Sequence, residues 1–490
     1  MKRFLLLGAA VLVPRLLVFP FNENLGGDAV VRVWLGDGWA ANPHLITSFT
    51  RGAVQFGPLH IYLVGLAGLL WPSPEHAGRL VSLIVGALTA WPLHALTRRL
   101  FDVRAADVAV LCFACWGLHI QCSTTASSEA LNLLVVMGAL AALQAWLDTA
   151  KVSALLGSAL LLNLACMTRY DSWLLVPMLV LVVALRSWRT ALLFGAASSV
   201  FAATWMVGNA LDLGDPLYPF TYINDFHRRW YASDKLYWGP VFYRLYAFFF
   251  WPGVALFTLT PLVATAGGAG MVRAWRTVPR SRWLIVVTLV PTLMYAVRSS
   301  ILGGFVPLSR FAVKEVAFLL PFVWPGATWA LQRLPRLGKP VLAVAVAMLV
   351  GWPLWLGLFT FRTDGVWQNS FRPVSPTSTN SPRMMRVARY LHDGNSDAGV
   401  LLVDTDPRGY DDLQFSFFTG FPNERSARLR NPKYAEHLQP GDPRWIARFE
   451  GGELETKGLA TVDGGTLEFR GARFVEVDLQ AAPLHLYRRE

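Results

Sequence analysis

Long apolar runs, each bounded by charged or turn-forming residues, recur along the first three quarters of the chain. A run of about 20 apolar residues can cross the hydrocarbon core of a bilayer as a helix. By apolar length and flanking charge we predict about eleven such spans, at residues 4–21, 77–97, 106–122, 129–147, 153–168, 172–186, 190–208, 241–270, 283–297, 311–331 and 341–361. The pattern predicts a polytopic α-helical membrane protein.

Basic residues fall mostly in every second loop of this scheme. These loops hold Arg98, Arg99, Arg104, Lys151, Arg186, Arg189, Arg273, Arg276, Arg280, Arg282, Arg333, Arg336 and Lys339. Short loops rich in Lys and Arg stay in the cytoplasm, so the N-terminus is predicted inside and the C-terminus outside. The first run is interrupted by Pro14 and Arg15 and lacks a small-residue cleavage site, which favours an uncleaved helix over a signal peptide. We expect a multi-pass protein of the inner (plasma) membrane.

One apolar segment, residues 56–71, does not fit this alternation as a span. Counting it as a span would place Arg98 and Arg99 outside, against the bias of basic loops. The segment is also short and is followed by the sequence WPSPEH. We therefore predict an interfacial or re-entrant helix within a long first outer loop, residues 22–76.

Composition agrees with a membrane protein. Hydrophobic residues make up 54% of the 490 positions and charged residues 16%, and the mean hydropathy is +0.40. The formal net charge of +12 would suit nucleic acid, but no basic stripe or binding module accompanies it. The positive-inside bias explains this charge, so no nucleic-acid partner is expected.

Chemically versatile residues gather in the segments predicted to face outward. Asp28 and Arg32 open the first outer loop, Glu129 begins a span, and the sequence TRYDSW at 168–173 lies between two spans. Residues 214–240 form an aromatic-rich outer loop, and Arg310, Lys314 and Glu315 stand at the mouth of the tenth span. Charged side chains at a helix mouth are costly unless they pair or face water, so they are functional candidates.

The order of these elements resembles that of the GT-C glycosyltransferases of family 39 type, the group of protein O-mannosyltransferases and lipid A aminoarabinose transferases. The resemblance spans residues 1–330 and rests on the segments GGDAVVRV, PLHIYL, GRLVSLIVGALTAWPLHALTRRLF, SSEA, TRYDSWLLVP and GDPLYPFTYI. This group transfers a sugar from a polyprenyl-phosphate donor outside the membrane, usually with inversion. The chain departs from it in having Asp28-Ala29 where many members have two adjacent acids.

The resemblance implies a role for each candidate residue. Asp28 would be the catalytic base for an acceptor hydroxyl on a glycan, lipid or protein. Cations would bind the donor phosphate, and polar residues would orient these cations or the sugar. The phosphate-binding candidates are Arg169, Arg310, Lys314 and Arg32, and the orienting candidates are Glu129, Asp171 and Tyr170. Some members of the group bind a metal at their outer acids and others do not, so no cofactor is assigned and a divalent metal stays open.

Each candidate also has a purely structural interpretation. Asp28 and Glu129 can cap helix N-termini, and Asp37, between two glycines, is expected in a turn. Arg169 and Asp171 can form a structural ion pair. Arg310 and Lys314 lie four residues apart and can extend to lipid headgroups. We expect His60 to be packed or interfacial.

The composition of the chain changes after residue 361, where the long apolar runs end. We predict a linker at 362–380, rich in Pro, Ser and Thr, and a small extracytoplasmic α/β domain at 381–490, outside the transmembrane domain of 1–361. The domain should contain a helix at RMMRVARYLHDG, a strand at AGVLLVDTD and a hairpin at RFVEVDLQAAPLHLYRR. Asp404-Thr405-Asp406 imitates the metal motif of nucleotide-sugar transferases, but too few residues precede it for that fold, and we favour a strand end and turn.

Two other functions fit a chain of this kind. A polytopic transporter or flippase would be equally hydrophobic, although transporters tend to show repeated halves and mid-membrane polar sites. A lipid-linked glycan ligase uses similar lipid donors but transfers a whole glycan. The sequence favours a hexosyl or pentosyl transferase over both.

Overall fold

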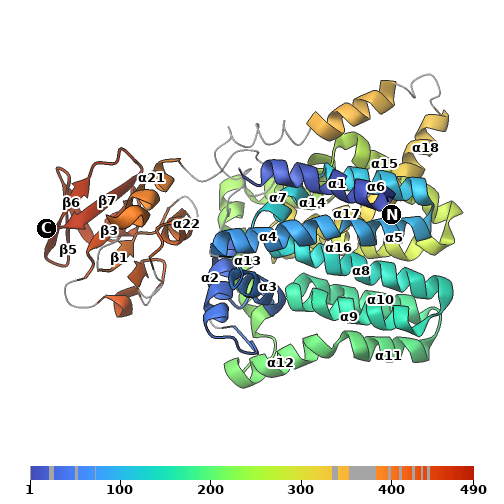
Figure 1. The fold of residues 1–490 in the computed structure, drawn as a ribbon, viewed down its shortest axis with the longest axis horizontal. Helices are drawn as coiled ribbons and strands as arrows, with labels where there is room; N and C mark the ends of the chain where they lie inside the picture. Colours follow the sequence, from blue (N-terminus) through green and yellow to red (C-terminus); the bar gives the residue numbers. More distant parts are fainter. Residues whose placement is uncertain are drawn as a thin grey trace. The chain divides into compact units, whose positions relative to one another are not determined.

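The computed structural model describes residues 2–20, 27–49, 53–71, 73–333, 340–351, 382–395, 399–407, 411–421, 425–431, 434–438 and 442–490. The chain divides into two compact units, Met1–Asn22 with Arg32–Thr377 and Glu23–Val31 with Ser378–Glu490. The first unit is helical and the second contains a β-sheet (Figure 1). The predicted linker at 362–380 lies outside the described residues, and the last predicted span is described only up to Gly351.

The first half of the helical unit follows the apolar runs, although the predicted spans at 106–122 and 190–208 are each divided into two helices. Its helices are α1 (Lys2–Val18), α2 (Gly27–Ala41), α3 (Pro58–Gly68), α4 (Pro74–Leu88), α5 (Ala90–Leu100), α6 (Val103–Ala114), α7 (Gly117–Thr124), α8 (Ser128–Thr149), α9 (Val152–Thr168), the 3-10 helix η1 (Tyr170–Leu174), α10 (Leu175–Ala184), α11 (Trp188–Ser198) and α12 (Val200–Leu213).

The second half differs from the prediction in two places. It contains α13 (Tyr218–Trp238), α14 (Pro240–Thr258), α15 (Pro261–Thr277), η2 (Pro279–Ser281), α16 (Arg282–Val297), the π-helix η3 (Arg298–Leu302), η4 (Ser309–Ala312), α17 (Val313–Leu319), η5 (Leu320–Phe322) and α18 (Val323–Arg333). The predicted aromatic loop at 214–240 is largely the helix α13. The predicted single span at 241–270 is two helices, because Thr260 caps α15 by accepting from the Val263 amide at 3.0 Å and Pro261 follows it.

Four helical stretches among the described residues are long and apolar enough to cross a membrane: Glu75–Leu100, Ser128–Thr149, Pro240–Thr258 and Pro279–Leu302. Two further pairs qualify as bent spans, α6 with α7 at 62° and α11 with α12 at 44°. The helix α3 has 11 residues, about 16 Å at 1.5 Å per residue, and is too short to cross a bilayer alone. The protein is therefore a multi-pass membrane protein, and the count of eleven spans stays a prediction.

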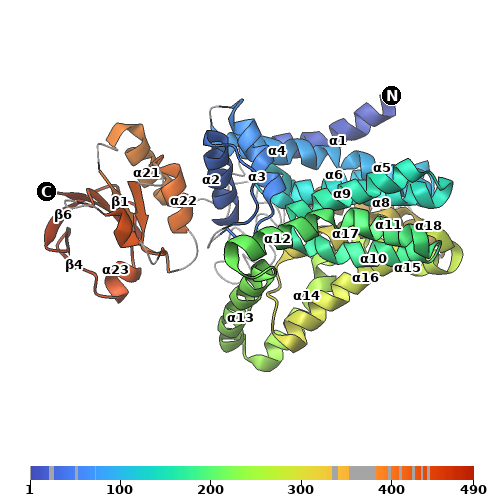
Figure 2. The ribbon, with the colours of Figure 1, turned by 90° about the horizontal axis from the view of Figure 1, so that it is seen from below.

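Basic loops meet at one end of the helical unit. Figure 2 shows the helical unit from a second direction. Arg280 Nε donates to the Leu100 carbonyl at 2.9 Å, Arg99 Nη1 lies 3.2 Å from Asp148 Oδ2, and Arg186 donates to the Leu147 carbonyl. The loops that follow α5, α8, α10 and α15 are thus neighbours. Their shared position agrees with the alternation of basic loops in the sequence, while the assignment of this end to the cytoplasm stays a prediction.

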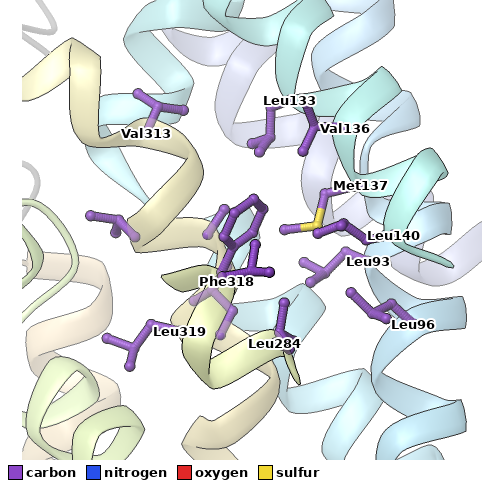
Figure 3. Close-up of a cluster of buried hydrophobic side chains, with 14 of the residues drawn as sticks. Leu93, Leu96, Leu133, Val136, Met137, Leu140, Leu284, Val313, Phe318 and Leu319 are labelled. Carbon is purple, nitrogen blue, oxygen red and sulfur yellow. The ribbon is translucent and has the colours of Figure 1, made fainter. Parts of the chain in front are cut away.

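The core of the helical unit lies between α5, α8, α16 and α17 (Figure 3). Phe318 of α17 is fully buried among leucines and a methionine of the neighbouring helices, including Leu93, Met137, Leu140 and Leu284. Every residue of α17 is buried, the charged Lys314 and Glu315 included. Val313 and Phe318 pack in this core, and they therefore fix the position of the ionisable Lys314 and Glu315, which lie between them on α17.

The second unit contains a seven-stranded sheet of order β2-β1-β3-β7-β6-β5-β4. Its elements are α21 (Pro382–Tyr390), β1 (Leu401–Val403), α22 (Asp411–Phe418), β2 (Ser426–Arg428), β3 (Trp445–Phe449), α23 (Glu453–Thr456), β4 (Ala460–Asp463), β5 (Thr466–Phe469), β6 (Ala472–Val477) and β7 (Leu484–Arg489). The strand β1 pairs in parallel with β2 and β3, and the remaining pairs are antiparallel. The predicted helix, first strand and final hairpin are all present.

Candidate functional site

Four ionisable side chains, two of them buried and two partly exposed, form a continuous chain of ion pairs. Arg169 Nη1 lies 2.6 Å from Glu129 Oε1, and Arg169 Nε lies 3.0 Å from Asp171 Oδ1. The other oxygen of Asp171 accepts from Lys314 Nζ at 2.5 Å. The structure thus brings together residues from the start of α8, the end of α9, η1 and α17, separated by up to 185 positions in the sequence. We call these four residues the charge network.

Local structure explains how the charge network is held. Arg169 has an extended backbone between α9 and η1, and its side chain reaches Asp171 of η1 as well as Glu129 of α8. Ser172 Oγ donates to Asn132 Oδ1 at 2.8 Å, which fixes η1 against α8, where Glu129 lies in the first turn. The exposed fractions of the Glu129 and Lys314 side chains are 3% and 4%, so these charges lie away from bulk solvent.

Two further predicted cations lie close to the charge network. The guanidinium groups of Arg310 and Arg169 approach the ring of Phe311, at 5.3 Å and 5.7 Å from its centroid. Arg32, only 4% exposed, lies over the ring of Phe56 at 4.1 Å. Together with Arg169, both act electrostatically on Glu129. All four predicted phosphate-binding residues therefore belong to one end of the helical unit.

Asp28 has a different setting from the other candidates. It is the second residue of α2 rather than its N-cap, and it is one helical turn before Arg32. The first residues of α2 group with the second unit. Its approach to the charge network therefore stays a prediction. Asp37, expected in a turn, instead lies inside α2 and is exposed.

Tyr170 has a structural role that the sequence did not suggest. Its hydroxyl donates to the carbonyl of Val54 at 3.0 Å and accepts from Trp205 Nε1 at 2.9 Å. It thereby fastens the segment before α3 to the end of α9. Gly57 tightens the same junction, because a Cβ there would lie 2.2 Å from the Met167 carbonyl oxygen. The predicted part of Tyr170 in orienting a sugar stays a prediction beside this structural role.

Sequence reasoning missed two arginines beside these elements. Arg79, 3% exposed, donates to the carbonyl of Thr124 at 2.9 Å and so holds the C-terminal end of α7 before Glu129. Arg298 donates to Asn224 Oδ1 at 2.8 Å and lies 5.2 Å from the centroid of Phe305. Arg298 carried a usable signal, because an arginine at the predicted outer end of a span opposes the positive-inside bias.

The structure offers no metal site among the residues that it describes: no group of three or more His, Cys, Asp or Glu side chains is arranged to hold an ion. The carboxylates of Glu129 and Asp171 are held by Arg169 and Lys314. Asp404 is fully buried, and its carboxylate accepts from the amides of Thr405 at 2.8 Å, Leu454 at 3.0 Å and Phe449 at 3.2 Å. These bonds close a turn against α23, which agrees with the favoured interpretation of the Asp404-Thr405-Asp406 motif.

Comparisons with known proteins agree with the resemblance in the sequence. The family model described as dolichyl-phosphate-mannose-protein mannosyltransferase matches residues 55–207. Crystal structures of ArnT from Cupriavidus metallidurans superpose with TM-scores of 0.65 in the apo state and 0.63 bound to undecaprenyl phosphate. Their sequence identities are 14% and 16%, and the matches cover 99% of this chain and 98% of ArnT.

A more distant likeness extends to a second kind of enzyme. The oligosaccharyltransferase of Archaeoglobus fulgidus, crystallised with Zn and sulfate, matches with a TM-score of 0.55 and 13% identity, over 91% of this chain and 68% of that protein. The chain has the GT-C fold. The predicted GT-C resemblance is confirmed, and at these identities the similarity to solved structures concerns the fold. No curated protein matches the sequence. The family model covers residues from Gln55 into the middle of α12, and this segment includes Glu129, Arg169 and Asp171.

Proposed function

We propose that this protein is a membrane glycosyltransferase that moves a sugar from a polyprenyl-phosphate donor to an acceptor hydroxyl on the outer face of the membrane, with inversion. The observation that carries this proposal is the buried charge network at one end of a GT-C fold. ArnT bound to undecaprenyl phosphate, and an archaeal oligosaccharyltransferase in complex with dolichol-phosphate, support this class of donor.

The cations are suited to a phosphate that gains charge as it leaves. Glu129 and Asp171 hold Arg169 and Lys314 in fixed positions, and Arg32 and Arg310 add positive charge around Glu129. Cations that are placed before the reaction stabilise developing negative charge without reorganisation. We assign the four cations to binding of the donor phosphate. Glu129 and Asp171 are positioning residues that hold Arg169 and Lys314.

Asp28 is our candidate for the general base. It is half-buried in the first turn of α2, next to the turn that carries Arg32. Its carboxylate would take the proton of the acceptor hydroxyl as the hydroxyl oxygen bonds to the anomeric carbon. The bond from that carbon to the phosphate oxygen breaks, and polyprenyl phosphate leaves with the bonding electrons. Such a displacement passes through an oxocarbenium-like state and inverts the anomeric carbon.

Transfer from a labelled polyprenyl-phosphate sugar, measured in proteoliposomes with an envelope extract as acceptor, tests this proposal. Loss of a general base typically costs about 10²–10⁴-fold in rate, which we expect for Asp28→Asn. Asp37→Asn, an exposed position on the same helix, is the matched control and should keep wild-type turnover. Wild-type turnover by Asp28→Asn would refute its role.

The same assay separates the alternative functions. A lipid-linked glycan ligase would transfer a whole glycan and would be inactive with a lipid-linked monosaccharide. A transporter would move solute across the vesicle membrane without any covalent product. Labelled acceptor from a monosaccharide donor excludes both.

A further inference from the structure

His60 stands out among the buried polar side chains of the helical unit. It lies in the first turn of α3 and has no exposed surface. Neither ring nitrogen has a hydrogen-bond partner among the described residues. Buried polar groups in native proteins nearly always have such partners, so each exception requires an explanation.

The other buried histidines of the helical unit show what a structural histidine looks like in this protein. His119 Nδ1 lies 2.8 Å from Arg15 Nη2, and His94 Nε2 lies 3.3 Å from Asp107. His227 Nδ1 accepts from the Val306 amide at 3.3 Å. Each therefore has at least one protein partner, and His60 differs from all three.

The surroundings of His60 belong to the proposed site. Arg32 and Glu129 are the charged residues that act electrostatically on its ring. The start of α3 is fastened to the segment that precedes Arg169, because Gly57 packs on the Met167 carbonyl. His60 follows Gly57 by three residues in the first turn of α3, so this close packing holds its backbone near the segment that carries Arg169.

We propose that His60 binds the sugar of the lipid-linked donor through hydrogen bonds between its ring nitrogens and sugar hydroxyls. This inference rests on the proposed function. A neutral imidazole offers one donor and one acceptor. Sugar hydroxyls both donate and accept, so they match both nitrogens, whereas phosphate oxygens only accept and suit the neighbouring arginines. In this proposal His60 binds the sugar, and the neighbouring cations bind the phosphate.

Binding of two ligands by purified protein in detergent tests this division. The ligands are a polyprenyl-phosphate monosaccharide and the sugar-free polyprenyl phosphate. His60→Phe keeps the ring shape and removes both nitrogens, and we expect it to weaken binding of the lipid-linked sugar by about 10-fold, the effect of one or two lost hydrogen bonds. Binding of the sugar-free lipid should stay unchanged. His60→Gln retains a donor and an acceptor and should recover most of the loss.

A matched control and a stability measurement make the result decisive. His94→Phe changes a buried histidine that pairs with Asp107, and it should alter neither affinity. Without ligand, His60→Phe should melt at or above the wild-type temperature, because it removes unsatisfied polar atoms. If His60→Phe does not fold, His60→Ala replaces it with the same expectations for binding.

Two outcomes overturn this inference alone while wild-type protein still transfers sugar. In the first, His60→Phe binds the lipid-linked sugar as wild type does. In the second, it loses affinity for both lipids equally, which would place His60 at the phosphate or in the fold. If wild-type protein transfers no sugar from any lipid-linked donor, the proposed function and this inference both fail.

Discussion

The two ends of the helical unit carry the same types of charged residue in opposite settings. The 22-residue helix α8 joins them, with Glu129 in its first turn and Asp148 in its last. Asp148 pairs with Arg99, whose side chain is 41% exposed, while Glu129 pairs with Arg169, whose side chain is 12% exposed. At the end of α8 that carries Asp148, Arg280 and Arg186 donate to carbonyls at helix ends. At the end that carries Glu129, Arg169 pairs with the carboxylates of Glu129 and Asp171.

The difference teaches that the two sets of charges serve different purposes. Exposed ion pairs contribute little, with a median of about 0–1 kcal/mol, so the pair of Arg99 with Asp148 adds little to stability. Buried ion pairs are weak evidence for stability, because apolar residues of similar volume are often as stable or more stable. The charge network, in which Glu129 and Lys314 are buried and Arg169 and Asp171 are partly exposed, therefore favours the proposed chemistry at that end.

The largest expected effect is the difference in unfolding free energy between two variants, each of which lacks one arginine at one end of the helical unit. Arg169→Met leaves the buried Glu129 without its bonded partner, and we expect a loss of about 3–5 kcal/mol in unfolding free energy. Arg99→Met, the matched change at the exposed end, should cost less than about 1 kcal/mol. Titration with a denaturing detergent measures both. Equal costs would show that burial does not distinguish the two ends.

The second unit tests the same contrast outside the membrane. Asp404 is buried and bonded to three amides, and burial raises its pKa while these bonds lower it, with a net increase. Because hydrogen bonds to charged groups contribute about 1.5–3 kcal/mol each, Asp404→Ala should cost about 3 kcal/mol. Asp463→Ala, on the exposed face of β4, should stay within about 0.5 kcal/mol. Amide hydrogen exchange of β3 in the intact protein reports both, and full protection of β3 in Asp404→Ala would contradict the structural role.

Most of the helical architecture was predictable because lipid imposes long apolar runs. The failures have local causes. The break between α14 and α15 depends on Thr260 as a cap with Pro261 after it, and apolar neighbours on both sides concealed this signal. The helix α13 was concealed by its polar and aromatic composition, which resembles an interfacial loop. In the second unit the strands β2 to β5 were missed, since three of them have only 3–4 residues.

The grouping of the charge network was predictable, but its bonds were not, and the role of its members stays a prediction. The sequence placed Glu129, Arg169, Asp171 and Lys314 at one end, because topology alone brings these segments together. It could not show that Asp171 bridges Arg169 and Lys314, since such a bond depends on side-chain packing across α8, η1 and α17. Nor could it show that Tyr170 holds the outer segment through the Val54 carbonyl.

A smaller effect is the salt dependence of the coupling energy of the ion pairs at the two ends. A double-mutant cycle on Arg99 and Asp148 should give a coupling of about 0.5 kcal/mol at low ionic strength that vanishes near 1 M salt, where the Debye length is about 3 Å. The same cycle on Arg169 and Glu129 should give a larger coupling that changes little with salt, because buried pairs are screened much less. A strongly salt-dependent coupling at Arg169 would place its charge network in open water.

The smallest effect concerns pH and the exposed ion pairs of the second unit. His485 lies 2.7 Å from Glu476 and 3.0 Å from Glu450. Burial lowers the pKa of His485, but the two carboxylates raise it by more, so the net shift is upward. A raised folded-state pKa contributes stability that is complete below the unfolded value of about 6.5 and is lost as pH rises through the folded value. Protection of β7 amides from hydrogen exchange should therefore exceed that of His485→Gln by less than about 1 kcal/mol at pH 5.5, and the two proteins should agree at pH 9. A difference that persists at pH 9 would mean that the ring acts through packing, as the buried residues do, rather than through its charge.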